Sequence, residues 1–170
     1  MISYQLVNEY LDKIELPQSI EQVLSHQYTM ADTELEFINN ANDCLRKYES
    51  YKDYRLKDVH CMGSCLTNLT RVGLYFLLKN ELIFVSTSNL KDSSMEDDWK
   101  ITHYPFREIQ ELDMELMEGN EESKYNSGVL YMKLLNEKGS ARTHVLRNFN
   151  PNHFQCFKEF HRDIISMDRL

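Results

Sequence analysis

The stretch Arg71–Val85, RVGLYFLLKNELIFV, contains two apolar runs, Val72–Leu78 and Leu82–Val85, separated by a polar triplet. A short apolar run has no diagnostic period, so its composition has to decide between helix and strand. Both runs are rich in aromatic and β-branched residues, which favour a pleated surface. Asn80 tolerates positive φ where a turn needs it, and Gly73 suits a strand that approaches another backbone closely. The stretch therefore predicts a tight β-hairpin.

Both strands of this hairpin carry apolar residues on both faces, which is typical of central strands covered on each side. Alternating polar and apolar residues predict further strands near 59–66, 99–103, 109–116, 129–134 and 141–147. Asn150, followed by Pro151, predicts the start of a C-terminal helix. Its inner stripe consists of apolar residues and one histidine: Phe154, Phe157, His161 and Ile164, flanked by Phe160 and Ile165. We expect an α+β fold, a seven-stranded antiparallel barrel or sandwich capped by this helix.

Residues 1–56 predict a helical N-terminal arm, and residues 57–170 the sheet domain. Apolar residues recur at steps of four over 1–15, which is typical of an amphipathic helix. Pro17 is placed to open a second short helix, and a third is expected to begin near Asp32 or Thr33. Because the arm cannot bury its apolar faces alone, we expect it to pack on the sheet or on a partner.

Composition narrows the class of function. The 170-residue chain has a net charge of −8, which disfavours nucleic acids and anionic membrane surfaces as partners. Acids dominate from Asp92 to Glu122, by eleven to two, whereas bases dominate from Ser123 onward, by eight to four. This asymmetry predicts two surface patches of opposite charge. No signal peptide and no transmembrane segment is evident, so we expect a cytoplasmic protein.

The region from about residue 58 to 167 resembles a bacterial pleckstrin-homology-like (PH-like) domain, in the style of the GRAM and YokE-like families. The matching landmarks are Gly73 ahead of LYFL, then Leu82–Phe84, then ITHYP followed by FREI, and the terminal helix with Phe157. The likeness covers about two-thirds of the chain and lies in element order and apolar spacing. It implies a binding module without enzymatic activity.

In eukaryotic relatives of this fold, lysines and arginines in the first-to-second-strand loop hold inositol phosphates. Here that loop is Thr67–Arg71, TNLTR, with a single arginine. One arginine does not neutralise a multiply charged headgroup, so the sequence argues against phosphoinositide binding.

The sharpest chemical cluster in the sequence is His60, Cys61 and Cys65, with Cys44 or Cys156 available to complete four zinc ligands. Four residues apart on a strand, the Cα atoms of Cys61 and Cys65 lie roughly 13 Å apart, too far for one metal or a disulfide. We therefore expect buried free thiols, no metal and no cofactor. A nucleophilic pair of Cys65 with His103 or His144 is formally possible, but no flanking signature supports it.

These observations favour a non-enzymatic module for protein–protein association, with a partner protein or a second copy of the chain. An open sheet edge is one expected docking site, because it accepts an added strand. The alternative is a domain that binds a lipid or a small apolar ligand in a pocket between sheet and arm. The candidate ligand-binding residues for that pocket are Phe76, Phe84, Trp99 and Phe157.

Overall fold

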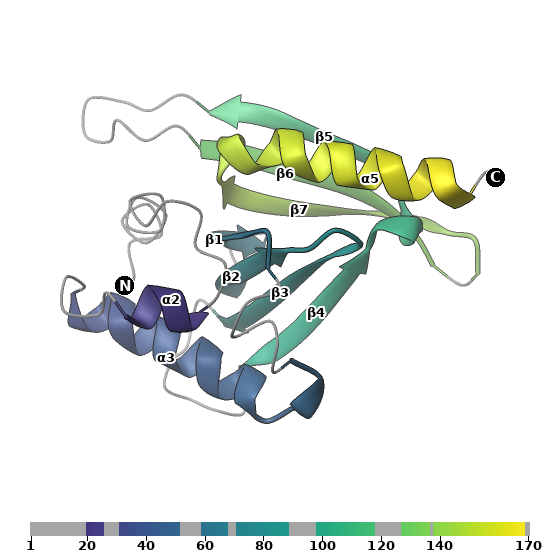
Figure 1. Cartoon of the computed structure of the whole chain (residues 1–170). Helices are drawn as coiled ribbons and strands as arrows, with labels where there is room; N and C mark the ends of the chain where they lie inside the picture. The colour runs from purple at the N-terminus through teal and green to yellow at the C-terminus, as the bar shows by residue number, and fades with distance from the viewer. Residues whose placement is uncertain are drawn as a thin grey trace.

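The computed structural model describes residues 20–25, 31–51, 59–67, 71–88, 98–117, 127–136 and 138–168. Within these ranges the chain forms one curled, seven-stranded antiparallel sheet with helices on both sides (Figure 1). The strands are β1 (Cys61–Thr67), β2 (Arg71–Leu77), β3 (Glu81–Ser88), β4 (Lys100–Pro105), β5 (Ile109–Met117), β6 (Ser127–Leu135) and β7 (Ala141–Phe149). The helical segments are α2 (Ile20–Leu24), α3 (Asp32–Arg46) and α5 (Phe154–Asp168), with 3-10 turns η2 (Glu49–Tyr51), η4 (Phe106–Glu108) and η5 (Pro151–His153). The predicted α+β class is confirmed.

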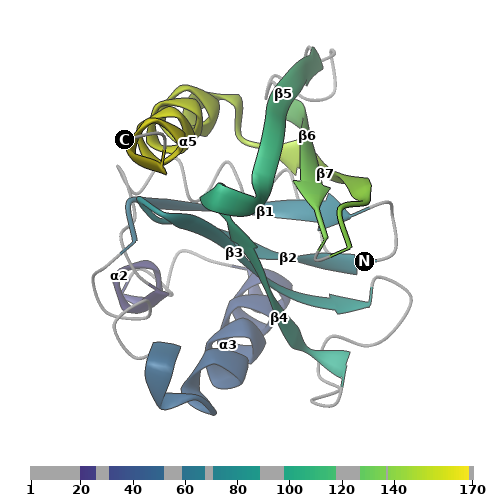
Figure 2. The ribbon, with the colours of Figure 1, turned by 90° about the vertical axis from the view of Figure 1, so that its right-hand side faces the viewer.

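The sheet order is β4-β3-β2-β1-β7-β6-β5, so the described strands form a half-barrel whose two edges are β4 and β5. The chain passes from one edge to the other through η4, which turns the corner between them. The junction β1–β7 is narrow, with two register pairs, Leu66 with Arg147 and Thr67 with Leu146. The sheet curls so that β5–β7 stand away from β1–β4 (Figure 2).

The hairpin predicted from Arg71–Val85 is confirmed as β2 and β3, which pair from Arg71 with Ser88 to Leu77 with Leu82. Gly73 marks a close approach, because a Cβ there would lie 2.0 Å from the carbonyl oxygen of Val85. The expected role of Asn80 is wrong: among the described residues, the non-glycine residue with positive φ is Asn148, at 59°. Asn148 lies where β7 carries one extra residue against β6, so the left-handed residue serves a β-bulge instead of the hairpin turn.

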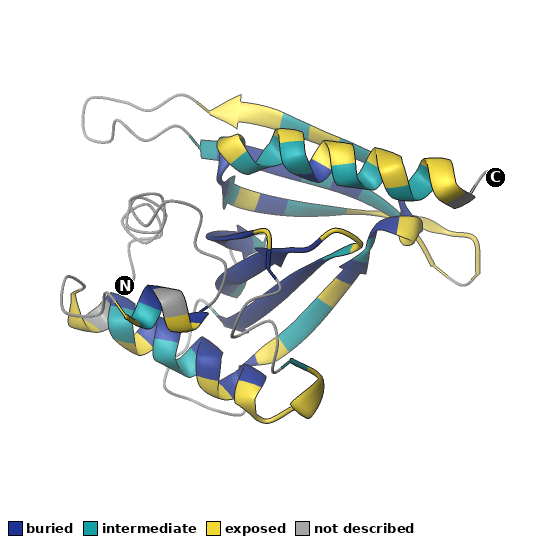
Figure 3. Cartoon of the chain, in the orientation of Figure 1, coloured by how far each residue is buried: buried dark blue, intermediate teal, exposed yellow. Residues whose placement is uncertain are grey.

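The central strands are buried on both faces, as their composition predicts (Figure 3). Alternate side chains enter two different apolar clusters. Leu74, Phe76 and Ile83 face α2 and α3, whereas Tyr75, Leu77 and Phe84 face α5. Since successive strand residues point to opposite faces, each central strand supplies two cores at once.

The described part of the N-terminal arm packs on the chain's own sheet. Helix α3 buries one face completely: Phe37, Ile38, Ala41 and Leu45 have no exposed surface. Ile20 and Val23 of α2 join the same cluster. The helix predicted over residues 1–15 lies outside the described residues. The apolar stripes of α2 and α3 therefore serve the fold and are not available as a docking face.

The C-terminal helix covers the other face of the sheet, as predicted. The Asn150 side chain accepts a hydrogen bond from the Asn152 amide at 2.9 Å, and Pro151 follows it. The cap starts the single turn η5, and α5 begins after it at Phe154. Phe157 is fully buried and stacks on Phe106 of η4, with ring centroids 5.1 Å apart. The helix is thus anchored at the corner where the sheet changes edges.

One glycine lets a tyrosine cross from β2 over β1. Gly63 and Tyr75 are register partners, and a Cβ on Gly63 would collide with the Tyr75 ring. The ring stacks on Phe149, with centroids 4.5 Å apart. Its hydroxyl reaches the start of the C-terminal helical segment, where it lies 2.7 Å from Nδ1 of His153. The sheet and the helix are thereby joined by a polar contact inside an aromatic cluster.

Candidate functional site

The four predicted ligand-binding residues do not surround one pocket. Phe76 and Trp99 belong to the cluster under α3, whereas Phe84 and Phe157 belong to the cluster under α5. All four are buried in packed cores. The hairpin register explains the separation: Phe84 is opposite Tyr75, so Phe76, one residue on, faces the other side. A single pocket lined by all four is therefore excluded, and their part in ligand binding stays a prediction.

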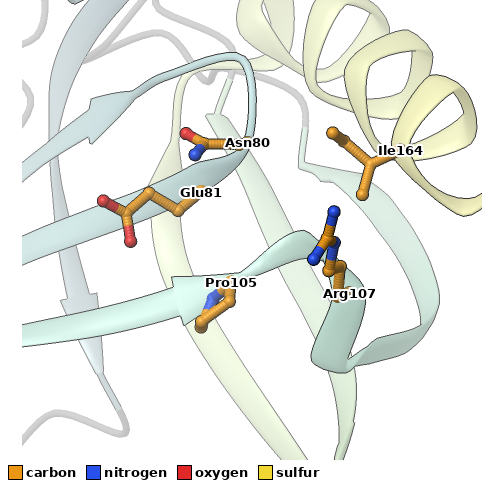
Figure 4. Close-up of a pocket in the computed structure, with 5 residues that line it drawn as sticks. All are labelled: Asn80, Glu81, Pro105, Arg107 and Ile164. Atoms are coloured by element: carbon orange, nitrogen blue, oxygen red, sulfur yellow. The ribbon is translucent and has the colours of Figure 1, made fainter. Parts of the chain in front are cut away.

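A pocket of about 370 Å³ opens instead at the corner between the two sheet edges (Figure 4). Three separate parts of the chain line it. The β2–β3 turn supplies Asn80 and Glu81, the β4–η4 corner supplies Pro105 and Arg107, and α5 supplies Ile164. The Arg107 side chain extends into the space between the turn and the helix (Figure 4). The lining thus combines one guanidinium with the apolar side chains of Pro105 and Ile164.

The walls of this pocket are held by contacts outside it. The Phe106 amide donates to the Asn80 carbonyl at 3.0 Å, which ties the β2–β3 turn to η4. On the helix side, His161 Nε2 lies 2.8 Å from the Ile109 carbonyl oxygen and its ring meets Phe106 edge-on. With the Phe106–Phe157 stack, these contacts fix the three lining segments relative to one another. The pocket is therefore largely formed before any ligand arrives.

A chain of hydrogen bonds leads from the pocket rim to the arm. Glu81 Oε2 lies 3.0 Å from His103 Nδ1, and the other ring nitrogen of His103 contacts the hydroxyl of Tyr51. Tyr51 belongs to η2, beyond the end of α3. Its pKa is raised by partial burial and by the charge of Glu81. These hydrogen bonds link the arm to strands β3 and β4. Because they lie at the surface, they do not enclose a site.

The cysteines divide into three buried thiols and one half-exposed thiol. Cys44, Cys61 and Cys65 are buried, and burial raises the pKa of each, that of Cys61 to about 12. Burial of Cys65 therefore opposes the thiolate that the nucleophilic pair considered from the sequence would need. The Cys–His contact that the fold creates is Cys156 Sγ with His60 Nε2, at 2.9 Å. Burial and Glu159 raise the pKa of this thiol as well, which opposes thiolate formation at neutral pH.

The cysteines considered as zinc ligands from the sequence lie on opposite faces of the sheet. Cys61 and Cys65 lie on β1 as predicted, in the cluster under α5, whereas Cys44 lies on α3 in the opposite cluster. Among the described residues, no three His, Cys, Asp or Glu side chains gather as a metal site requires.

His153 is held in its neutral form. Burial, reinforced by the nearby His60, lowers its pKa from 6.5 to about 4. Its Nδ1 lies 2.7 Å from the Tyr75 hydroxyl oxygen, and that oxygen accepts from the Asn150 amide at 3.2 Å. Its Nε2 lies 3.4 Å from the side-chain Nδ2 of Asn150. Since the side-chain amide nitrogen of Asn150 can only donate, Nε2 is the acceptor, and the network requires an uncharged imidazole. It stabilises the start of the helical segment.

Strand β5 presents the most exposed surface of the sheet (Figure 3). Glu111, Asp113 and Glu115 alternate along its outer face and are all exposed. At its end, Leu116 and Met117 leave 53% and 48% of their surface in solvent. We call these five residues the β5 surface; Met117 continues the face of the carboxylates, whereas Leu116 lies on the face of Leu112 and Met114. Lys133 lies 3.9 Å from Glu111, and the Tyr131 hydroxyl donates to Glu115 at 3.2 Å. Arg147 also lies near Tyr131. Among the described residues two cations therefore accompany three carboxylates, which leaves this surface acidic.

The backbone edge of β5 is partly occupied by the chain itself. The Asp113 carboxylate accepts from the Met114 amide at 2.8 Å, and His161 occupies the Ile109 carbonyl. The register against β6 also shifts between Ile109 and Glu111. Bulges and side chains that occupy edge groups limit uncontrolled strand pairing. The open edge expected from the sequence therefore has backbone groups that are already hydrogen-bonded along its first half, which hinders strand addition there. The last residues of β5 are the most exposed.

Arg71, the arginine of the first-to-second-strand loop considered for phosphoinositide binding, is hydrogen-bonded to other parts of the sheet domain. Arg71 donates to the carbonyl oxygens of Ser86 at 2.8 Å and Asp98 at 2.6 Å. It also pairs with the Asp98 carboxylate at 3.6 Å. Residues 68–70 lie outside the described residues. The engaged guanidinium supports the expectation that this loop does not bind a phosphorylated headgroup.

No protein-family model matches the sequence, and no curated protein matches it either. Within the described ranges, no helix has both the length and the apolar character needed to cross a membrane.

Proposed function

We propose that the chain is a non-enzymatic module for protein–protein association, and that it binds a basic segment of a partner protein on the β5 surface. The observation that carries this proposal is the alternation of three exposed carboxylates on an outer strand that ends in two exposed apolar residues. Complementary charge orients a partner, and exposed apolar side chains provide area to bury. The proposal extends to the bacterial PH-like character that the sequence resemblance implies, and to the cytoplasmic location expected from the absence of a recognisable signal peptide or membrane span in the sequence.

Charge favours a different protein over a second copy of this chain. If two β5 strands paired about a two-fold axis centred on Asp113, Glu111 of one copy would lie opposite Glu115 of the other. Like charges directly opposite each other on paired strands destabilise the pairing. We therefore expect the isolated protein to be a monomer in light scattering, and a basic segment to be its ligand.

The test uses a defined peptide, a fluorescent-labelled octamer of alternating lysine and valine, followed by anisotropy at physiological salt. Its lysines share one face when the peptide is extended, and so match the spacing along β5. A block octamer with four lysines and then four valines controls for composition. We expect the alternating peptide to bind at least about tenfold more tightly than the block peptide, because only its charges align.

Two triple variants separate a docking surface from simple net charge. The first reverses the β5 carboxylates, Glu111→Lys, Asp113→Lys and Glu115→Lys. The second reverses three exposed acids of the arm, Glu36→Lys, Asp43→Lys and Glu49→Lys, with the same change of charge. We expect the first to abolish binding and the second to retain most of it. Equal loss in both triples, or equal affinity for the two octamers, would refute the proposal.

A further inference from the structure

Strands β5–β7 continue the sheet face on which α3 packs, but α3 itself contacts β2, β3 and β4. Leu66, a residue of the cluster under α3, is the register partner of Arg147, so Arg147 and its alternate neighbours on β7 belong to this same face. The opposite face is occupied, because Leu130, Met132 and Leu146 belong to the cluster under α5. Helix α5 lies along that side of the strands (Figure 1). We call the first face of β5–β7 the outer face.

The register across β5–β7 arranges the side chains of the outer face in rows. Tyr131 pairs with Asp113 on one side and with Val145 on the other, so these three residues form one row across the strands. We call it the middle row. Asp113 is exposed, whereas Tyr131 and Val145 are half-buried. An aromatic ring that is partly open to solvent is thus flanked by a carboxylate and by an apolar side chain.

The acids of the two neighbouring rows already have partners within the sheet. Lys133 lies 3.9 Å from Glu111. The Tyr131 hydroxyl donates to Glu115 at 3.2 Å, and this bond raises the pKa of the tyrosine. Asp113 accepts from the backbone amide that follows it, at 2.8 Å. A carboxylate has more acceptor positions than one amide occupies, so Asp113 is the acid of β5 best placed to pair with a cation from a partner.

We propose, building on the function proposed above, that the partner's basic segment places an arginine on the Tyr131 ring, with its guanidinium paired to Asp113. A guanidinium stacks on an aromatic face and offers a carboxylate two parallel N–H donors. The ammonium of a lysine is a more strongly hydrated point charge, so it gains less at such a site. The middle row therefore selects arginine over lysine.

The cations of the outer face determine the side from which the arginine approaches. Arg147 lies near the Tyr131 ring from β7. Like charges repel, so we expect the incoming guanidinium on the β5 side of the ring, where Asp113 lies. The charge of Lys133 is offset by Glu111, and the three carboxylates of β5 outnumber these two cations. The occupant that matches this face is a cationic protein segment.

The experiment compares two fluorescent-labelled octamers, alternating arginine and valine and alternating lysine and valine, followed by anisotropy at physiological salt. The peptides have the same charge and the same pattern, and they differ only in the basic group. We expect the arginine octamer to bind about fivefold more tightly, because only a guanidinium combines stacking with a paired contact to the carboxylate. A block octamer of four arginines and then four valines controls for general affinity for arginine and should bind more weakly than the alternating one.

Variants of the tyrosine locate the contact. Tyr131→Leu removes the ring and should weaken binding of the arginine octamer about fivefold and that of the lysine octamer by less, so that the preference disappears. Tyr131→Phe keeps the ring without the hydroxyl and should keep most of the preference. Tyr48→Leu removes an exposed tyrosine beyond the end of α3 and should change neither affinity. Each variant is checked for an unchanged amide spectrum away from the substitution, which establishes folding.

Two single changes of equal charge test the role of Asp113. Asp113→Asn should weaken binding of the arginine octamer about fivefold or more, because it removes the acid of the middle row. Glu111→Gln removes the same charge from β5, but its carboxylate is paired with Lys133, so we expect a loss of about twofold or less. Equal losses would show that the octamer responds to net charge, and would overturn the pairing with Asp113.

Different outcomes contradict the β5 surface and the arginine contact. Equal binding of alternating and block octamers would remove both. The β5 surface stands if the alternating lysine octamer binds and the triple reversal of the β5 carboxylates abolishes that binding. The arginine contact then falls on its own if the two alternating octamers bind equally, or if Tyr131→Leu leaves the preference unchanged.

Discussion

The two faces of the sheet are covered by helices of the same length, fifteen residues each, but they are held in different ways. Under α3 the contacts between described residues are mostly aliphatic, and they include the aromatic pair of Phe37 with Trp99. Under α5 the contacts form a run of stacked rings from Phe106 to Tyr75, with histidines at its ends. The α3 face is held chiefly by apolar area, whereas the α5 face adds directional contacts that fix the helix at one position.

This difference teaches where a functional surface can form on the molecule. An apolar contact tolerates small shifts, so it suits an arm that only has to cover the core. Stacked rings and hydrogen bonds hold side chains in fixed positions. The corner pocket and the start of β5 both lie beside α5, where such contacts are found. The predictions below test the contrast, from the largest expected effect to the smallest.

Removing the ring at the centre of the α5 face should give the largest loss of stability. Phe157→Ala deletes a fully buried ring that contacts both Phe106 and Phe149. We expect the free energy of unfolding to fall by roughly 3–5 kcal/mol, from lost burial and from the cavity left behind. Urea denaturation followed by circular dichroism measures it. A loss below about 1 kcal/mol would show that α5 does not close the sheet.

The matched change on the other face is Phe37→Ala. This ring is also fully buried, and among the described residues its ring contact is with Trp99, at 5.6 Å. We expect a loss of about 3 kcal/mol, at the lower end of the same range, because the aliphatic surroundings can relax. A larger loss here than for Phe157→Ala would reverse the contrast between the two faces.

Acid should weaken the α5 face through His153. Its pKa is about 4 in the folded chain, against an ordinary value of 6.5, so the unfolded chain binds the proton more tightly. Stability should therefore fall as the pH drops from about 6.5 to about 4 and level off below, by up to about 3 kcal/mol. His144, whose pKa burial also lowers, contributes in the same direction.

The control for this pH effect is His153→Gln, which keeps a hydrogen-bonding side chain but does not titrate. Thermal denaturation of the variant between pH 7 and pH 4 should show a shallower slope than that of the parent. Identical slopes would show that the His153 ring takes up no additional proton on unfolding in this range.

The smallest effect is expected where the arm meets the sheet edge. Tyr51→Phe removes the hydroxyl that contacts His103 but keeps the ring, whose centroid lies 5.6 Å from that of the imidazole. Because the contact is exposed, we expect a loss of less than about 1 kcal/mol. Urea denaturation checks it, and a loss comparable to that of Phe37→Ala would show that the arm depends on this hydrogen bond.

Much of the fold could be predicted from the sequence because apolar residues recur with a period of about two in half-buried strands and about 3.6 in amphipathic helices. Alternation located five of the strands, the composition of two apolar runs located β2 and β3, and Asn150 with Pro151 marked where the C-terminal helical segment begins. It was also predictable that the side chains of Phe76 and Phe84 point to opposite faces of the sheet, since the hairpin register pairs Tyr75 with Phe84. The error came from grouping aromatic residues by type without following the register.

The contacts between distant segments could not be predicted in the same way. Cys156 and His60 are 96 residues apart and Tyr75 and His153 are 78 apart, so no spacing in the sequence connects them. The corner pocket depends on three segments that meet only after the sheet curls. Whether the arm would pack on its own sheet was likewise left open, because an amphipathic stripe does not specify what it covers.

The Tyr75 ring lying over Gly63 makes these two positions a coupled pair in any related sequence. A side chain larger than hydrogen at position 63 can be accommodated only if position 75 loses its ring, and the helical segment then loses its link to β2 through His153. Diverged versions of this fold should therefore exchange residues 63, 75 and 153 together, or not at all.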